Sequence, residues 1–131
     1  MFKTGDSFTQ QFMVSDGTYL GFIHLFKDKN PLHTSTEFAM NKGFKGAVMH
    51  GNILNGYLSF FIGECLPTKN VIIHSQEIQF KNPVYLNDKL DFNATIIGFY
   101  ESVGVVEFKF DFKNSDSKVA AKGKIQIGLL K

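Results

Sequence analysis

The chain has 131 residues, of which 44% are hydrophobic and 20% charged, and its formal net charge is +2. These values are typical of one globular domain that can bury a hydrophobic core, so we expect a single domain over residues 1–131. The small net charge and the scattered lysines argue against a nucleic-acid-binding protein.

The N-terminal third of the chain predicts one strand followed by short helices. Residues 8–14 read as a strand, and residues 16–26 read as a helix. The apolar face of that helix is formed by Leu20, Ile23 and Phe26. A further helical turn is expected over residues 34–42, ended by Gly43.

The longest helix is predicted over residues 51–66. Its apolar residues recur at spacings of three and four and are Ile53, Leu54, Tyr57, Leu58, Phe61, Ile62 and Cys65. Phe60 adds apolar character outside this face, so we expect the helix to be buried on most sides. Pro67 ends it.

The rest of the chain predicts strands only. They cover residues 71–80, 89–100, 103–113 and 119–130, with a hairpin loop at Asn114-Ser115-Asp116. Consecutive strands after one helix indicate an α+β fold with an antiparallel sheet. Because the helix is too apolar to lie on a wet surface, we expect the sheet to curve around it.

An acid–base pair is suggested by Asp28 and His33, which stand five residues apart. The Asn30-Pro31 pair between them forces a loop, because a residue before proline avoids the helical region. Such a loop can turn the carboxylate and the imidazole toward one water molecule, which general acid–base chemistry would use. The alternatives are that Asp28 caps a turn and that His33 lies on the surface.

Three further residues stand at or within the long helix. Gly51, after His50, can leave backbone N–H groups uncovered at the helix start, where an anionic oxygen is stabilised. The alternative is a glycine needed for close packing, and His50 can simply shape the helix start. Ser59, about two turns later, either bonds back to its own helix or orients a ligand.

Metal binding and membrane association are not expected. The four histidines and the single cysteine show no close-spaced ligand pair, so we expect no metal site. One cysteine also excludes an internal disulfide and fits a reducing compartment. No apolar run approaches the roughly 18 to 20 residues of a membrane span, and we see no signal peptide. We therefore expect a cytoplasmic protein.

Four segments resemble the MaoC-like dehydratases, a family that includes the (R)-specific enoyl-CoA hydratases. The first is residues 22–39, with Asp28-Lys29-Asn30-Pro31-Leu32-His33 and Ala39. The similarity continues through Gly46-Ala47-Val48-Met49-His50-Gly51, the helix with Ser59, and residues 79–88. It thus covers most of the chain in the family's order.

The resemblance implies a hot-dog fold, in which a curved sheet wraps a long central helix and two subunits pair. It implies reversible hydration of trans-2-enoyl thioesters to (R)-3-hydroxyacyl thioesters, with coenzyme A or acyl-carrier phosphopantetheine as part of the substrate and no separate cofactor. Asp28 and His33 would hold the catalytic water. The expected oxyanion- or substrate-binding residues are Gly51, Ser59, Asn30 and His50. The expected assembly is a homodimer or a higher oligomer.

The chain departs from the family pattern at two places. Phe26 and Lys27 stand where the family usually has a small residue and a glycine, and Asn87-Asp88 stands where Gly-Asp is usual. Two alternatives to the hydratase reading remain open. One is a thioesterase, whose only candidate carboxylate on the long helix is Glu64. The other is a non-catalytic module that binds acyl thioesters.

Overall fold

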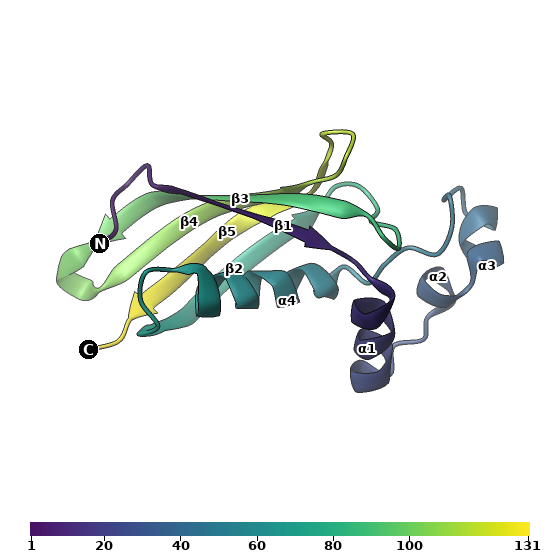
Figure 1. The fold of residues 1–131 in the computed structure, drawn as a ribbon, viewed down its shortest axis with the longest axis horizontal. Coiled ribbons are helices and arrows are strands. Elements are labelled where there is room, and N and C mark those ends of the chain that lie inside the picture. The colour runs from purple at the N-terminus through teal and green to yellow at the C-terminus, as the bar shows by residue number, and fades with distance from the viewer.

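Residues 1–131 are described by a computed structural model, in which one antiparallel sheet packs along a long helix (Figure 1). The strands are β1 (Ser7–Met13), β2 (Val71–Phe80), β3 (Lys89–Tyr100), β4 (Val105–Lys113) and β5 (Val119–Leu129). The helices are α1 (Asp16–Phe26), α2 (Pro31–Thr34), α3 (Thr36–Asn41) and α4 (Asn52–Phe60), with a π-helical turn η1 (Phe61–Cys65) and a 3-10 turn η2 (Glu101–Val103). No helix combines the length and apolar character that crossing a bilayer needs.

The sheet has the strand order β1-β3-β4-β5-β2, so β1 and β2 are its two edges. All neighbouring strands run antiparallel, as the sequence predicted. Side chains alternate between the two faces of each strand. On β4 the buried set is Val106, Phe108, Phe110 and Phe112, and these rings form much of the core against α4.

The long predicted helix is present as α4 continued by η1, but the expectation that it is buried on most sides is wrong. Ile53, Leu54 and Leu58 face the sheet and are buried, whereas Phe60 is 48% exposed. The five strands cover only one side of the helix (Figure 1). The opposite side, which includes Ser59, therefore faces outward in the single chain.

The predicted apolar face of α1 is also wrong. Leu20 and Phe26 are 58% and 67% exposed, and no residue of α1 is fully buried. The helix instead contacts the core through Tyr19 and Phe22. Figure 1 shows the reason, because α1, α2 and α3 lie beyond one end of the sheet, while α4 alone runs along it. The predicted turn over residues 34–42 corresponds to the end of α2 and to α3.

Candidate active site

The loop that carries Asp28 is shaped by its neighbours on both sides. α1 ends at Lys27, whose left-handed backbone (φ 65°, ψ 15°) turns the chain, and its N–H donates to the Ile23 carbonyl. Asn30 is extended (φ −51°, ψ 134°), as a residue before proline must be, and its side-chain oxygen accepts from the Leu32 N–H at 2.9 Å. One Asp28 carboxylate oxygen accepts from the Asn30 N–H at 3.1 Å.

His33, on α2, has a defined tautomer. Its Nδ1 lies 2.7 Å from the Val48 carbonyl oxygen, and a carbonyl can only accept. Nδ1 therefore carries a proton, and Nε2 has no protein partner, so it is the nitrogen that can exchange a proton with a water molecule. The Tyr19 hydroxyl donates to the His33 carbonyl at 2.5 Å and holds the backbone of this residue from α1.

His50 lies immediately before α4 and is only 3% exposed. Its Nε2 donates to the Asp28 backbone carbonyl at 2.9 Å. Its ring packs against that of His33, with centroids 4.1 Å apart and planes tilted by 30°. The ring of Phe22 also lies against it, with centroids 4.6 Å apart. His50 thus joins the Asp28 loop to the core.

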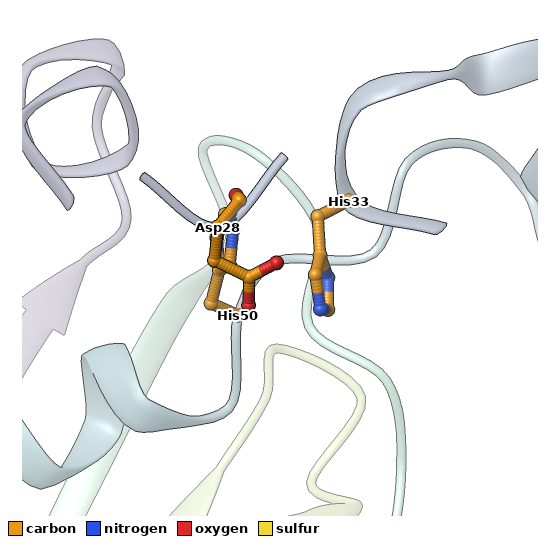
Figure 2. A group of neighbouring side chains, drawn as sticks. All are labelled: Asp28, His33 and His50. Carbon is orange, nitrogen blue, oxygen red and sulfur yellow. Dashed lines mark hydrogen bonds between the residues drawn. The ribbon is translucent and has the colours of Figure 1, made fainter. Parts of the chain in front are cut away.

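The structure brings Asp28 and His33 together, with His50 beside them (Figure 2). One nitrogen or oxygen atom from each of the three side chains lies within 4.8 Å of the others. Asp28 is exposed, His33 is half-buried and His50 is buried. The cluster therefore opens to solvent on the Asp28 side and is closed by protein on the His50 side.

The same three residue types can bind a metal ion, so their geometry bears on that question. His33 Nδ1 and His50 Nε2 are already bonded to carbonyl oxygens. The two rings and the Asp28 carboxylate still offer a set of three possible ligand atoms within 4.8 Å of one another, which no spacing in the sequence suggested. The absence of a metal site stays a prediction.

Gly51 lies at the N-terminus of α4, where the first N–H groups of a helix have no partner within the helix. Neither the Gly51 nor the Asn52 N–H donates to a backbone carbonyl. A Cβ on Gly51 would stand 2.8 Å from Phe80 Cε1, at the end of β2. A side chain at position 51 would therefore force the Phe80 ring to move, and the glycine leaves the amide groups available.

Two cavities meet at this cluster. An inner cavity of about 270 Å³ is lined by His33, Gly51 and Phe80, among other residues. An open groove of about 770 Å³ runs between α1 and α4 and contains Asp28. Its apolar residues are Phe22, Leu25, Phe26, Ile53 and Tyr57. Asn52 and Ile53 line both spaces, so the two cavities are adjacent at these residues.

Tyr57, on the groove wall, has an altered pKa. Burial raises the pKa of its phenol, and a hydrogen bond with Thr18 opposes that rise. The phenol also donates to the Met13 carbonyl at 3.2 Å. Tyr57 therefore stays neutral and fixed as part of the groove wall.

Two of the predicted site residues are placed differently from the sequence expectation. Ser59 is exposed on the outer side of α4, lines neither cavity, and stands about 12 Å along the helix from Gly51. It therefore does not reach Asp28 within one chain. Asn30 uses its side-chain oxygen to cap α2, so its observed role is to shape the loop.

Sequence reasoning missed Phe80 and Tyr19, and it gave His50 too small a part. Phe80 follows Gly51 by 29 residues and Tyr19 precedes His33 by 14, so neither contact has a local signature. The sequence does give one indication for His50. It stands just before a helix whose first apolar residues are buried, so its side chain lies close to the core.

The sequence of this chain is similar to a known protein family and to individual enzymes. The profile of the family described as "MaoC like domain" matches residues 7–111. The (R)-specific enoyl-CoA hydratase of Rhodospirillum rubrum is 29% identical over 107 residues, 82% of this chain and 74% of that protein. The (R)-specific enoyl-CoA hydratase of Aeromonas caviae is 32% identical over 80 residues, 61% of this chain and 60% of that protein.

Solved structures share the fold. The (R)-hydratase from A. caviae superposes with a TM-score of 0.89 at 23% identity, covering 98% of this chain and 97% of that chain. An R-hydratase from Pseudomonas aeruginosa superposes with a TM-score of 0.88 at 22% identity, covering 99% and 83%. The predicted α+β hot-dog fold is thereby confirmed.

Proposed function

This chain belongs to the MaoC-like domain family, and from that premise we propose that it catalyses reversible hydration of trans-2-enoyl thioesters to (R)-3-hydroxyacyl thioesters. The curated relatives include the two enoyl-CoA hydratases above and a mitochondrial 3-hydroxyacyl-[acyl-carrier-protein] dehydratase from Arabidopsis thaliana, 26% identical over 126 residues, 94% of this chain and 75% of that protein. The thioester carrier is accordingly coenzyme A or an acyl-carrier protein. The single observation that carries the proposal is the approach of Asp28 to His33 at the junction of two cavities.

The protonation state of the pair defines the proton transfers. His33 Nδ1 donates to the Val48 carbonyl, which leaves Nε2 to exchange a proton with water, and one Asp28 carboxylate oxygen accepts from the Asn30 N–H while the other has no bond to the protein. In this proposal the pair adds no proton of its own to the product. In hydration it removes a proton from water as the oxygen attacks the β carbon, and it returns that proton to the α carbon. Atoms balance, since one water molecule is added across the double bond.

The negative charge that develops between these steps lies on the thioester oxygen. In this proposal the oxygen accepts from the free N–H groups at the start of α4, at Gly51 and Asn52. The positive end of the helix dipole adds to that stabilisation. One such donor contributes about 2.7 to 4 kcal/mol in cases where it has been removed.

Binding of the substrate follows from the two cavities. Because they are adjacent at Asn52 and Ile53, we place one linear thioester along both, with its reacting carbons between Asp28 and His33. Besides the protein's own residues, the proposed steps use only the substrate and water. The departure at Phe26 falls on the groove wall, so it acts on the acyl or carrier part of the substrate rather than on proton transfer.

We further propose that the working unit is a homodimer or a higher oligomer. The edge strand β2 carries the exposed Ile72 (51%) and Phe80 (52%), and the outer side of α4 carries Phe60 (48%). An unpaired sheet edge and exposed apolar residues beside it favour pairing with a second copy. A role for Ser59 at the reaction centre then belongs to a neighbouring subunit, because the residue points away from its own chain's Asp28.

The structure weakens the thioesterase alternative. Glu64 is exposed in η1, its carboxylate is paired with Lys69 Nζ at 2.7 Å, and it lines neither cavity. That carboxylate is not placed to attack a thioester held near Asp28. The non-catalytic binding alternative has no observation in its favour, since both members of the acid–base pair are present and close.

The experiment is a hydration assay on purified protein with crotonyl-CoA and a longer enoyl-CoA, following loss of the enoyl absorbance. Asp28→Asn and His33→Ala should each lower turnover by about two to four orders of magnitude, because each removes a proton-transfer group. The matched controls are Asp116→Asn and His24→Ala, both exposed and outside the two cavities. Wild-type turnover in either site variant, or release of free thiol without hydration, would contradict the proposal.

A further inference from the structure

His50 is the one buried polar residue of the chain, and it is incompletely satisfied. Its side chain is 3% exposed, and its Nδ1 has no hydrogen-bond partner. Buried polar atoms without partners destabilise a fold, so a residue that carries one in a core position usually serves another purpose. A leucine of similar volume would fill the same space without an unpaired nitrogen.

The other nitrogen of the imidazole, Nε2, makes a hydrogen bond that a leucine could not make. His50 Nε2 donates to the Asp28 carbonyl at 2.9 Å, across 22 residues of sequence. Asp28 stands in an exposed loop between α1 and α2, and this bond is the only one its carbonyl accepts. The loop is therefore anchored to the core at the residue that carries the carboxylate.

The same ring also determines where His33 lies. It packs against the His33 ring at 4.1 Å between centroids and 30° between planes, and Phe22 and Tyr19 lie at 4.6 and 6.0 Å between centroids. The His50 ring, which is buried, thus forms one wall of the space that His33 occupies. One buried side chain thus touches both members of the acid–base pair, one through a hydrogen bond and the other through stacking.

We propose that His50 is a positioning residue that sets the separation of Asp28 from His33. In this role His50 Nε2 carries a proton, because the Asp28 carbonyl can only accept. It takes no proton from the substrate. This inference rests on the proposed hydratase function for its kinetic readout, but the anchoring of the loop can be measured without any activity.

The test compares two substitutions that differ in one donor. In His50→Gln the side-chain amide nitrogen reaches the place of Nε2 and can still donate to the Asp28 carbonyl. In His50→Leu the volume is kept and the donor is lost. A misplacement of about 1 Å can cost about 100-fold in rate, so His50→Leu should lower kcat on crotonyl-CoA by that order with little change in KM. His50→Gln should restore most of kcat.

Thermal unfolding and amide hydrogen exchange complete the test. We expect His50→Leu to keep its melting temperature, since removal of the unpaired Nδ1 offsets loss of the bond to Asp28. Exchange over residues 27–33 should be faster in His50→Leu and near wild type in His50→Gln. His24→Leu, an exposed histidine of α1, is the control for both readouts.

The outcomes separate the two proposals. An inactive wild type with the expected exchange pattern would end the hydratase function and leave the anchoring role intact. Equal loss of kcat in His50→Leu and His50→Gln, or unchanged kcat and exchange in His50→Leu, would overturn the positioning role. If His50→Leu does not fold, His50→Asn takes its place, because that shorter amide stops short of the Asp28 carbonyl.

Discussion

The Phe80 ring lies directly against Gly51, with Cε1, Cζ and Cδ1 at 2.8, 3.0 and 3.2 Å from where a Cβ of Gly51 would stand. This contact joins the last residue of β2 to the first turn of α4, at the amide groups assigned to the thioester oxygen. The Gly51 backbone is helical (φ −58°, ψ −34°), so an alanine is excluded by Phe80 alone and not by backbone strain.

Gly51→Ala should therefore destabilise the protein by about 1 to 3 kcal/mol, the usual cost of an added methyl in a packed site. Phe80→Ala in the same chain removes the obstacle, so the double variant should be more stable than the sum of the two single effects. Denaturant unfolding of the four proteins measures this coupling. Strictly additive effects would show that Phe80 is not what requires glycine at position 51.

Replacing Lys27 by glycine should stabilise the protein. Its φ of 65° lies in the left-handed region, which costs a residue with a side chain about 1 to 2 kcal/mol. Glycine removes that strain, but it also makes the unfolded chain more flexible, which costs about 0.5 to 1 kcal/mol of stability. The net effect of Lys27→Gly should be a rise of about 0.5 to 1 kcal/mol in the free energy of unfolding. Lys29→Gly is the control, because Lys29 has no positive φ and should lose stability.

Substitutions of Asn30 can show whether this residue shapes the Asp28 loop or contacts the substrate. Asn30→Ala removes the cap on the Leu32 N–H and should cost about 1 kcal/mol, together with a lower kcat as the Asp28 loop loosens. Asn30→Asp keeps a capping oxygen and should keep both quantities near wild type. Urea unfolding and steady-state kinetics give the answer. A higher KM in both variants would instead indicate that the Asn30 amide contacts substrate.

Phe26 predicts a change in acyl-chain preference. It lines the groove beside Asp28, so Phe26→Ala widens that space. The ratio of kcat/KM for an eight-carbon enoyl-CoA to that for crotonyl-CoA should rise severalfold, within the range that apolar pocket contacts provide. Leu20→Ala, an exposed residue of α1 outside the groove, should leave the ratio unchanged. An unaltered ratio in Phe26→Ala would place the acyl chain elsewhere.

Phe60 tests the proposed subunit contact. Phe60→Asp puts a charge among the exposed apolar residues of α4 and should shift the protein from dimer toward monomer in sedimentation velocity runs. Val103→Asp, at a more exposed apolar residue in η2, is the control. If Phe60→Asp sediments as the wild type does, the outer side of α4 is not the contact.

The elements of the fold could be predicted from the sequence because each has a local cause. Alternation of apolar residues marked β4, the three-and-four spacing marked α4, and Asn30-Pro31 marked the loop after α1. What could not be predicted is which side of a helix is covered. Phe60 and Leu20 are apolar yet exposed, because the sheet covers one side of α4 and ends before α1.

In the candidate site too, some features could be predicted from the local sequence and others could not. The approach of Asp28 to His33 follows from a short loop between them, and the free amides follow from the start of a helix. The contacts of His50 with Asp28 and of Phe80 with Gly51 join residues 22 and 29 positions apart, so no local rule produces them. Both departures from the family pattern, Lys27 and Asn87, lie at positive φ (65° and 69°), where glycine is the unstrained choice.

Both ends of the chain lie at the end of the sheet opposite to α1, α2 and α3 (Figure 1). The entrance beside Asp28 therefore lies far from either terminus in the folded chain. An affinity tag, a fluorescent label or a surface tether attached at Met1 or Lys131 would leave that entrance unobstructed, and immobilised protein should remain accessible even to a bulky carrier-linked thioester.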